Sequence, residues 1–174
     1  AVKQVVTGIL SYGMSGRVFH APFIGGSESF QLKAIVERKN KQAHLDYPDI
    51  ISYSSVKELL EDPEIELVIV NTPNDTHFEF AKMALLAGKH VLVEKPFSPT
   101  VKEAKELFAL GRKMNRHVLP YHNRRFDSDF QSLKATLESG KLGKPVELHL
   151  RFDRYKTEIG AKKFKETKRP GSGI

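Results

Sequence analysis

The stretch VVTGILSYGMSG, residues 5–16, decides the fold. It continues an apolar and β-branched run over residues 4–10, typical of a buried strand, into a glycine-rich turn and a helix expected from Ser15. The turn over Ser11–Gly16 follows the fingerprint G-x-G-x-x-G with a serine in place of the first glycine. The combination predicts a dinucleotide-binding βα unit; an ordinary glycine-rich turn is the alternative interpretation.

Each position of this turn has an expected physical role. Gly13 would let a pyrophosphate approach the backbone closely, and Gly16 would allow the helix to pack against the strand. The backbone amides near Met14 and Ser15, at the start of the helix, would face the phosphates. Ser11 replaces the glycine of the tight turn, which is tolerated if φ stays negative there.

Strands and helices alternate over the first two-thirds of the chain. Strands are expected at 30–36, 50–53, 67–70, 90–93 and 118–121, and helices at 55–61, 76–86 and 100–114. This alternation is typical of right-handed βαβ units with a parallel sheet. The predicted fold class is α/β, a Rossmann doubly wound parallel sheet, with residues 1–122 as the NAD(P)-binding domain.

The pattern changes after residue 122. A helix is expected over 127–139 and a strand over Val146–Arg154. One helix and one strand cannot close a core of their own, so residues 123–174 predict the incomplete start of a second α/β domain. Its apolar positions need cover, which predicts a homo-oligomer; poor order in the tail beyond about residue 155 is the alternative. These positions include Phe126, Phe130 and Leu148.

Composition excludes several classes of function. The 174 residues contain no cysteine, which excludes disulfides and thiolate chemistry, and the histidines lack metal-ligand spacing, so no metal is expected. No apolar run approaches the roughly 20 residues of a membrane span, and no signal peptide is visible. We therefore expect a cytoplasmic protein without membrane contact.

The net charge of +7 raises the question of a nucleic-acid partner. Much of the excess lies late in the chain, at Lys156, Lys162, Lys163, Lys165, Lys168 and Arg169. No interleaved aromatic platform or nucleic-acid motif accompanies these residues. We interpret them as a solvated surface segment and expect no nucleic-acid partner.

The end of the second strand indicates which dinucleotide is bound. Glu37 lies where a carboxylate would meet the ribose diol of NAD, whereas Arg38 and Lys39 suit the 2′-phosphate of NADP. The two signals conflict. The sequence predicts NAD(P) as cofactor, and the two adjacent basic residues favour NADP.

A lysine follows the strand at 90–93 and is the candidate catalytic residue. Oxidation of an alcohol by a nicotinamide requires a protein group that accepts the hydroxyl proton. Glu94-Lys95-Pro96 lies at the carboxyl edge of the sheet, where ligands bind in open α/β folds. Lys95 would accept the proton, Glu94 could orient it, and Pro96 could follow a cis peptide bond. A simple loop is the alternative.

Polar residues follow the preceding strand in the same way. They are Asn71, Thr72, Pro73 and Asn74, with His77 early in the next helix. We expect them to line the nicotinamide side of the crevice, because the carboxyl ends of neighbouring parallel strands share one edge. For His77, packing at the helix start is the alternative.

These segments together resemble the Gfo/Idh/MocA family, which includes glucose–fructose oxidoreductase and inositol dehydrogenases. The resemblance rests on the glycine turn, residues 71–73, residues 94–96 and the segment Asn123-Arg124-Arg125-Phe126-Asp127. Residues 13–22 and 121–127 are closest to the scyllo-inositol dehydrogenase-like branch. The resemblance extends over the whole chain.

The resemblance implies an NAD(P)-dependent oxidoreductase that interconverts a polyol or sugar hydroxyl and a ketone. It implies that Lys95 is the catalytic lysine, that Asn123 and Arg124 lie near the nicotinamide and substrate, and that the second domain carries substrate and oligomer contacts. A small-molecule substrate is therefore the expected partner.

One departure bears on activity. Two-domain members of the family are expected to be roughly twice as long as this chain. The family's Asp-Leu-Gly-x-His segment, whose histidine works with the lysine, would follow Ile174. The expectation is an oxidoreductase that is inactive as this chain alone; the alternative is a non-catalytic NAD(P)-binding module.

Overall fold

A computed structural model describes residues 3–153, 155 and 157. The late basic cluster noted in the sequence lies outside these residues. The chain divides into two compact units, one over residues 1–121 and one beginning at His122, and each is described by itself.

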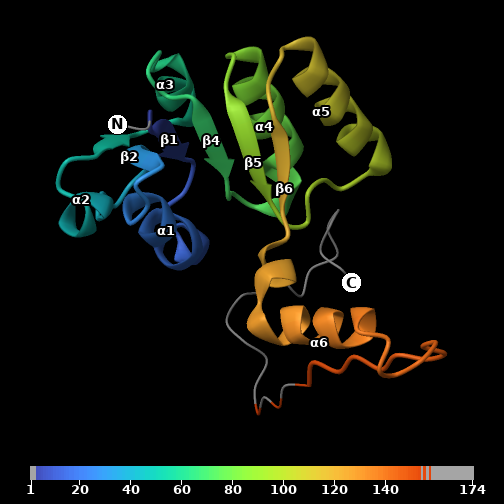
Figure 1. The fold of residues 1–174 in the computed structure, drawn as a ribbon. Coiled ribbons are helices and arrows are strands. Elements are labelled where there is room, and N and C mark those ends of the chain that lie inside the picture. The colour runs from blue at the N-terminus through green and yellow to red at the C-terminus, as the bar shows by residue number, and fades with distance from the viewer. Residues whose placement is uncertain (1–2, 154, 156, 158–174) are drawn as a thin grey trace. The chain divides into compact units, whose positions relative to one another are not determined.

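The first unit is built on six parallel strands in the order β3-β2-β1-β4-β5-β6 (Figure 1). Their bounds are β1 Val5–Ile9, β2 Phe30–Val36, β3 Ile51–Tyr53, β4 Leu67–Val70, β5 His90–Glu94 and β6 Val118–Tyr121. β1 pairs in parallel with both β2 and β4. The order therefore reverses between β1 and β4, which confirms the doubly wound Rossmann fold predicted from the sequence.

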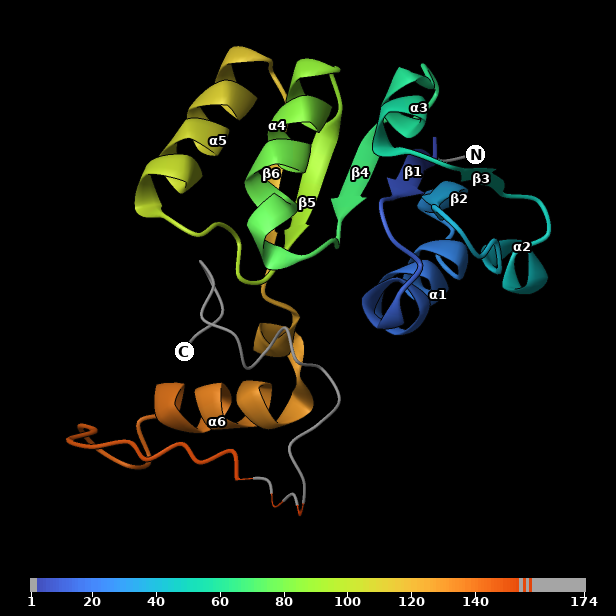
Figure 2. The ribbon, with the colours of Figure 1, turned by 180° about the vertical axis from the view of Figure 1, so that it is seen from behind.

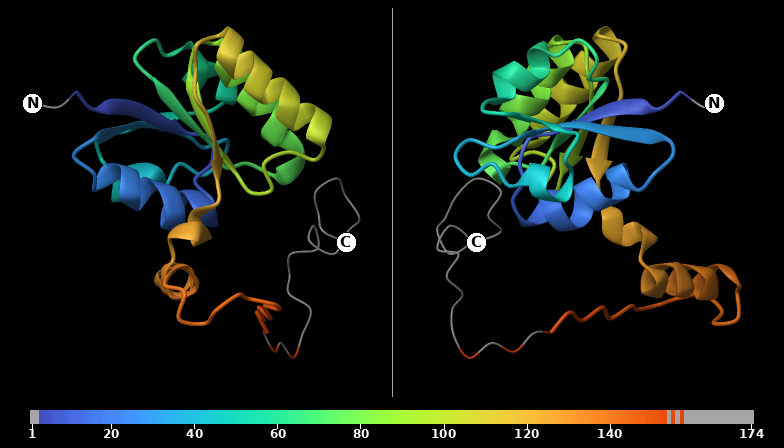
Figure 3. Two further views of the ribbon diagram at one scale, coloured as in Figure 1. Left: turned by 45° about the vertical axis from the view of Figure 1, so that its right-hand side comes forward. Right: turned by 90° about the vertical axis from the view of Figure 1, so that its left-hand side faces the viewer.

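Helices cover the sheet on both faces (Figures 2 and 3). On one face lie α3 (Val56–Glu61), α4 (His77–Leu86) and α5 (Val101–Lys113); on the other lie the π-helical segment η1 (Gly16–His20), α1 (Ala21–Gly25) and α2 (Ala43–Asp46). Alternate residues of one strand enter the two cores. In β2, Ala34 and Val36 pack toward α3–α5, whereas Ile35 packs with Ala21 of α1.

Local sequence signals explain where several of these helices begin and end. Thr100 and Glu103 form a reciprocal capping box at the start of α5, and the Ser55 hydroxyl accepts a hydrogen bond from the backbone amide of Glu58 at the start of α3. Gly88, just beyond α4, has φ of +76°, a conformation that glycine adopts without steric cost. These local interactions hold the helices that carry the loops of the site.

The loops that follow the strands gather at the carboxyl edge of the sheet. β1 and β4 are neighbours in the sheet. The connection after β1 leads to β2 on one side of this pair, and the connection after β4 leads to β5 on the other side. A crevice opens at such a point in a doubly wound sheet. The segments selected from the sequence around Ser11, Glu37, Asn71 and Lys95 all follow strand ends at this edge.

The second unit contains the short 3-10 helix η3 (Asn123–Phe126) and α6 (Ser128–Glu138). The helix expected over 127–139 is confirmed, but the strand expected over Val146–Arg154 is wrong. Residues 145–153 have no regular secondary structure, and Arg154 lies outside the described residues. A strand needs backbone hydrogen bonds to a neighbour, and the described part of this unit holds no other strand.

Two further features are absent from the part of the chain that the structure describes. Among the described residues, no helix is both long and apolar enough to span a bilayer. In the same part of the chain, no group of three or more His, Cys, Asp or Glu side chains is arranged to hold a metal ion.

A candidate dinucleotide site at the carboxyl edge of the sheet

The two glycines of the first turn have different physical reasons to be glycine. A Cβ built on Gly16 would lie 2.1 Å from the carbonyl oxygen of Ser11, so the turn and helix could not approach as they do. A Cβ on Gly13 would meet only the Ser11 hydroxyl, at an ordinary 3.5 Å. Neither packing nor a positive φ requires Gly13, and the space beside it is open to a ligand.

Ser11 stabilises the turn through its own side chain. Its hydroxyl accepts a hydrogen bond from the backbone amide of Gly13 at 3.3 Å. This short-range contact closes the turn locally. The serine thus takes over the position where the fingerprint usually has a glycine.

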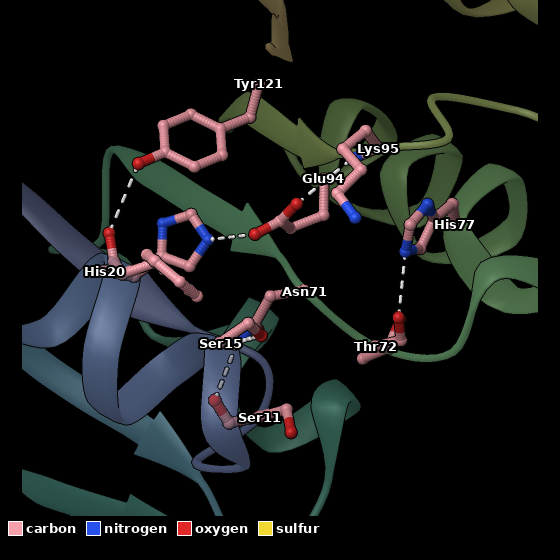
Figure 4. Close-up of polar contacts among 10 residues, drawn as sticks. Ser11, Ser15, His20, Asn71, Thr72, His77, Glu94, Lys95 and Tyr121 are labelled. Atoms are coloured by element: carbon pink, nitrogen blue, oxygen red, sulfur yellow. Dashed lines mark hydrogen bonds and ion pairs between the residues drawn. The ribbon is translucent and has the colours of Figure 1, made fainter. Parts of the chain in front are cut away.

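Asn71 connects this turn to the end of β4 (Figure 4). Its side-chain amide nitrogen donates to the carbonyl of Ser11 at 2.8 Å and to the hydroxyl of Ser15 at 3.2 Å. The side chain is only 7% exposed, yet its Oδ1 is buried without a partner among the described residues. A buried acceptor of this kind needs a donor, and a sugar hydroxyl is a suitable one.

Glu37 has its carboxylate engaged within the protein. Its Oε1 accepts from the backbone amides of Gln42 and Ala43 at 2.7 and 3.1 Å, and its Oε2 accepts from the Ser52 hydroxyl at 2.7 Å. Glu37 is 6% exposed, whereas the neighbouring Arg38 is exposed. Glu37 therefore holds the start of α2, a short helix that the sequence analysis missed.

A cavity of about 450 Å³ lies between these loops. Its lining includes Ser11, Tyr12, Glu37, Arg38, Thr72 and Pro73. They come from the ends of β1, β2 and β4, so the structure brings together the turn, Glu37 and Arg38 after β2, and the loop after β4. A cavity of this size falls in the range of small-molecule sites.

Tyr12 contributes a contact that sequence reasoning did not find. Its hydroxyl donates to the Asp46 carboxylate at 2.6 Å, which ties the turn to α2. Burial, followed by the bond and charge of Asp46, raises the pKa of Tyr12 well above its ordinary value. Nothing in the local sequence indicates this pair, because the two residues are separated by an entire strand.

Lys95 follows β5 directly and is exposed at the carboxyl edge. The peptide bond between Lys95 and Pro96 is cis, as the sequence suggested. Glu94 accepts a hydrogen bond from the Lys95 backbone amide at 3.1 Å through Oε2, and its Oε1 lies 2.9 Å from His20 Nε2. The sequence analysis did not select His20; its only signal is its place on the helix after the turn.

His77 joins the segments after β4 and β5. Its Nδ1 lies 2.8 Å from the carbonyl oxygen of Pro96, and its Nε2 lies 2.8 Å from that of Thr72. Carbonyl oxygens only accept, so both contacts are hydrogen bonds when both ring nitrogens carry protons. At 1% exposure, His77 supports the crevice from behind and has little surface to offer a ligand.

The remaining selected residues lie in or beside two short 3-10 helices. Asn74 opens the 3-10 helix η2 (Asn74–Thr76), and the hydroxyls of Thr72 and Thr76 are hydrogen-bonded at 2.7 Å. Asn123 and Arg124 belong to η3 in the second unit, where Arg124 Nη1 donates to the Asp127 carboxylate at 2.8 Å.

The sequence of residues 5–122 matches the family described as "Oxidoreductase family, NAD-binding Rossmann fold" (Gfo/Idh/MocA). The chain belongs to this oxidoreductase family. The resemblance drawn from the sequence motifs is thereby confirmed. Residues 5–122 therefore form the NAD-binding Rossmann domain of this family.

Individual members of the family align over nearly the whole chain. The oxidoreductase YdgJ of Escherichia coli is 42% identical over 98% of this chain and 49% of its own length. The enzyme IolW of Bacillus subtilis, named scyllo-inositol 2-dehydrogenase (NADP(+)), is 35% identical over 92% of this chain and 45% of its own. The chain thus spans about half the length of the curated relatives it matches.

A solved structure supports the same fold. The putative oxidoreductase YPO2259 of Yersinia pestis superimposes with a TM-score of 0.87 at 40% identity. The match covers 91% of this chain and 45% of that one. The chain is therefore similar to one half of a family member.

Proposed function

We propose that this chain forms the cofactor-binding part of an NADP-dependent oxidoreductase that interconverts a polyol or sugar hydroxyl and a ketone. The observation that carries the proposal is Lys95, exposed at the carboxyl edge of an NAD(P)-binding Rossmann sheet directly after β5. The relative IolW, named for a polyol substrate and NADP, supports the choice of substrate class.

The residues around the crevice fit a dinucleotide. The open space beside Gly13 suits a close-lying pyrophosphate, which the backbone amides of Met14 and Ser15 would bind. The unpartnered Oδ1 of Asn71 suits a ribose hydroxyl. Thr72 and Pro73 line the cavity at the ends of β1, β2 and β4.

The arrangement after β2 supports NADP over NAD. A carboxylate that binds the ribose diol must be free to accept from it, but both oxygens of Glu37 accept from protein donors. Arg38 is exposed at the rim of the cavity, where a guanidinium would bind a 2′-phosphate. We therefore assign Glu37 to the support of the loop and Arg38 to the cofactor.

The chemistry requires one proton acceptor from the protein. When bound, NADP⁺ supplies a hydride acceptor. Lys95 in its unprotonated form takes the proton of the substrate hydroxyl at Nζ, and in the reverse direction it returns that proton to the carbonyl oxygen. The resemblance to the family implies that Asn123 and Arg124 bind the substrate.

Replacing Lys95 by methionine tests the proposal. In a two-domain protein that includes this chain, assayed with scyllo-inositol and NADP⁺, Lys95→Met should lower kcat by at least about 100-fold, the usual contribution of a general base. NADPH should bind the variant with nearly unchanged Kd, because methionine preserves most of the side-chain volume. Normal turnover by the variant would overturn the assignment of Lys95.

A non-catalytic NAD(P)-binding module is the second candidate, favoured by the chain's spanning about half the length of its relatives. The two candidates differ in one assay. Dehydrogenase turnover by the 174-residue chain alone would exclude the binding module, whereas NADPH binding without turnover would support it for this chain.

A further inference from the structure

Three side chains from distant parts of the sequence meet beneath Lys95 (Figure 4). His20 from η1, only 3% exposed, lies with its Nε2 2.9 Å from Glu94 Oε1 at the end of β5. The ring of Tyr121 from β6 packs against His20 with centroids 4.7 Å apart, and its hydroxyl donates to the carbonyl of Phe19 at 3.3 Å. The imidazole is thus held on two sides.

The carboxylate of Glu94 is fixed at both oxygens. Oε1 is bonded to His20, and Oε2 accepts from the backbone amide of Lys95 at 3.1 Å. Among the ion pairs of the described residues, none joins Glu94 to the amino group of Lys95. In Figure 4 that amino group lies between Glu94 and His77, apart from the bonded carboxylate.

This separation matters for a lysine that accepts a proton. A carboxylate that is free to swing onto a neighbouring amine favours the protonated form, and a protonated amine accepts no proton. We propose that His20 is a positioning residue, which holds the Glu94 carboxylate on the Lys95 backbone and so keeps the Lys95 amino group out of an ion pair. The inference rests on the proposed function of Lys95.

The electrostatics of Glu94 agree with this geometry. Burial alone would raise the pKa of Glu94, but the hydrogen bond and charge of His20, with the backbone amide and charge of Lys95, hold it below its ordinary value. The titratable groups packed around this carboxylate are His20 from η1, Tyr121 from β6 and the adjoining Lys95. Glu94 is therefore a carboxylate at neutral pH and needs a fixed partner.

The position of His20 also connects two parts of the site. The π-helical segment η1 begins at Gly16 in the phosphate turn and ends at His20. π-Helical turns are often found at functional sites. One short segment therefore carries both a glycine of the cofactor turn and the residue that orients the Glu94-Lys95-Pro96 turn.

Competitive acetylation of the cofactor-free chain tests the inference, because only unprotonated amines react with acetic anhydride. The rate at Lys95 is measured by peptide mass spectrometry against the exposed Lys102. In His20→Leu, Lys95 should react about tenfold more slowly, since an opposite charge nearby favours the protonated amine by about one pH unit or more. In His20→Gln the rate should match the wild type, because the glutamine amide can still donate to Glu94.

A double variant separates orientation from general damage to the fold. His20→Leu combined with Glu94→Gln removes the carboxylate and should restore the rate at Lys95. An unchanged rate in folded His20→Leu, or an equally slow rate in His20→Gln, would overturn the inference. Should His20→Leu fail to fold, His20→Asn, too short to reach Glu94, provides the same comparison.

NADPH titrations of the same samples distinguish the two proposals. If the wild-type chain does not bind NADPH, the proposed function fails, whatever the labelling rates. If it binds NADPH while His20→Leu leaves the rate at Lys95 unchanged, the positioning role alone fails.

Discussion

At the residue scale, the same amino acid serves different purposes a few positions apart. Gly16 is needed because the Ser11 carbonyl occupies the space of a Cβ, whereas Gly13 leaves space that only a ligand would fill. The neighbouring residues Glu37 and Arg38 also have different roles. Glu37 is buried and hydrogen-bonded within the protein, whereas Arg38 is exposed. Roles of this kind are visible only from the surroundings of each side chain.

The two glycines give a matched pair of substitutions. Gly16→Ala should lower the free energy of unfolding by about 3 kcal/mol, the upper range for overpacking, because the backbone of Ser11 has to move. Gly13→Ala should change it little but weaken NADPH binding at least about tenfold, since the methyl group would stand between the backbone and the pyrophosphate. Urea unfolding and NADPH fluorescence titrations measure the two effects; the reverse pattern would contradict these assignments.

Arg38 should discriminate between the two cofactors. Arg38→Ala is expected to raise the Kd for NADPH by about tenfold or more, because it removes a charged partner of the 2′-phosphate, and to leave the Kd for NADH nearly unchanged. Lys57→Ala, an exposed cation on α3, is the control and should affect neither. An equal loss of affinity for both cofactors would place Arg38 away from the 2′-phosphate.

At the scale of elements, side-chain pairs hold the helices and loops in place on the sheet. Tyr12 joins the phosphate turn to α2 through Asp46, and His77 joins the ends of β4 and β5. Asp62, the residue directly after α3, accepts hydrogen bonds from Lys33 of β2 and Tyr53 of β3 at 3.1 Å each. These contacts decide how the elements sit against one another.

Asp62 should make stability depend on pH. Burial opposes its charge, but the Glu64 backbone amide, Lys33 and Tyr53 hold its pKa below the ordinary 3.8. Its contribution to folding is therefore fully present above about pH 3.8 and is lost as the pH falls through the lower folded value. Asp62→Asn should be less stable than the wild type at neutral pH, and the difference should shrink in acid. Urea unfolding at both pH values measures this; a difference that grows in acid would contradict it.

At the scale of the whole molecule, much of the architecture follows from the sequence. The strand expected over 67–70 is β4 itself, because four consecutive apolar residues are typical of a strand buried on both faces. The strand expected over 146–154 was a wrong prediction, because residues 146–153 have no regular secondary structure. Alternation alone does not make a strand, since its backbone must find a partner.

The expected association of the chain with another copy also belongs to this scale. α6 has no buried residue, and Phe126 and Phe130 are exposed. Burial of such aromatic side chains favours association. The chain should sediment as a dimer or larger species, and Phe130→Glu should shift it toward the monomer, whereas Lys134→Glu should not. Sedimentation velocity that shows a monomer for the wild type would contradict this prediction.

The sequence by itself determined the Rossmann fold, the family and most segments of the candidate site, because apolar periodicity and the glycine turn are short-range patterns. Only the tertiary structure decided that Glu37 faces the protein, that Asn71 bridges β4 to the phosphate turn, and that His20 meets Glu94. The physical reason is that these contacts join residues brought together by the parallel sheet. A sequence pattern records the spacing of residues along one segment, but not which way a polar side chain turns once its neighbours are in place.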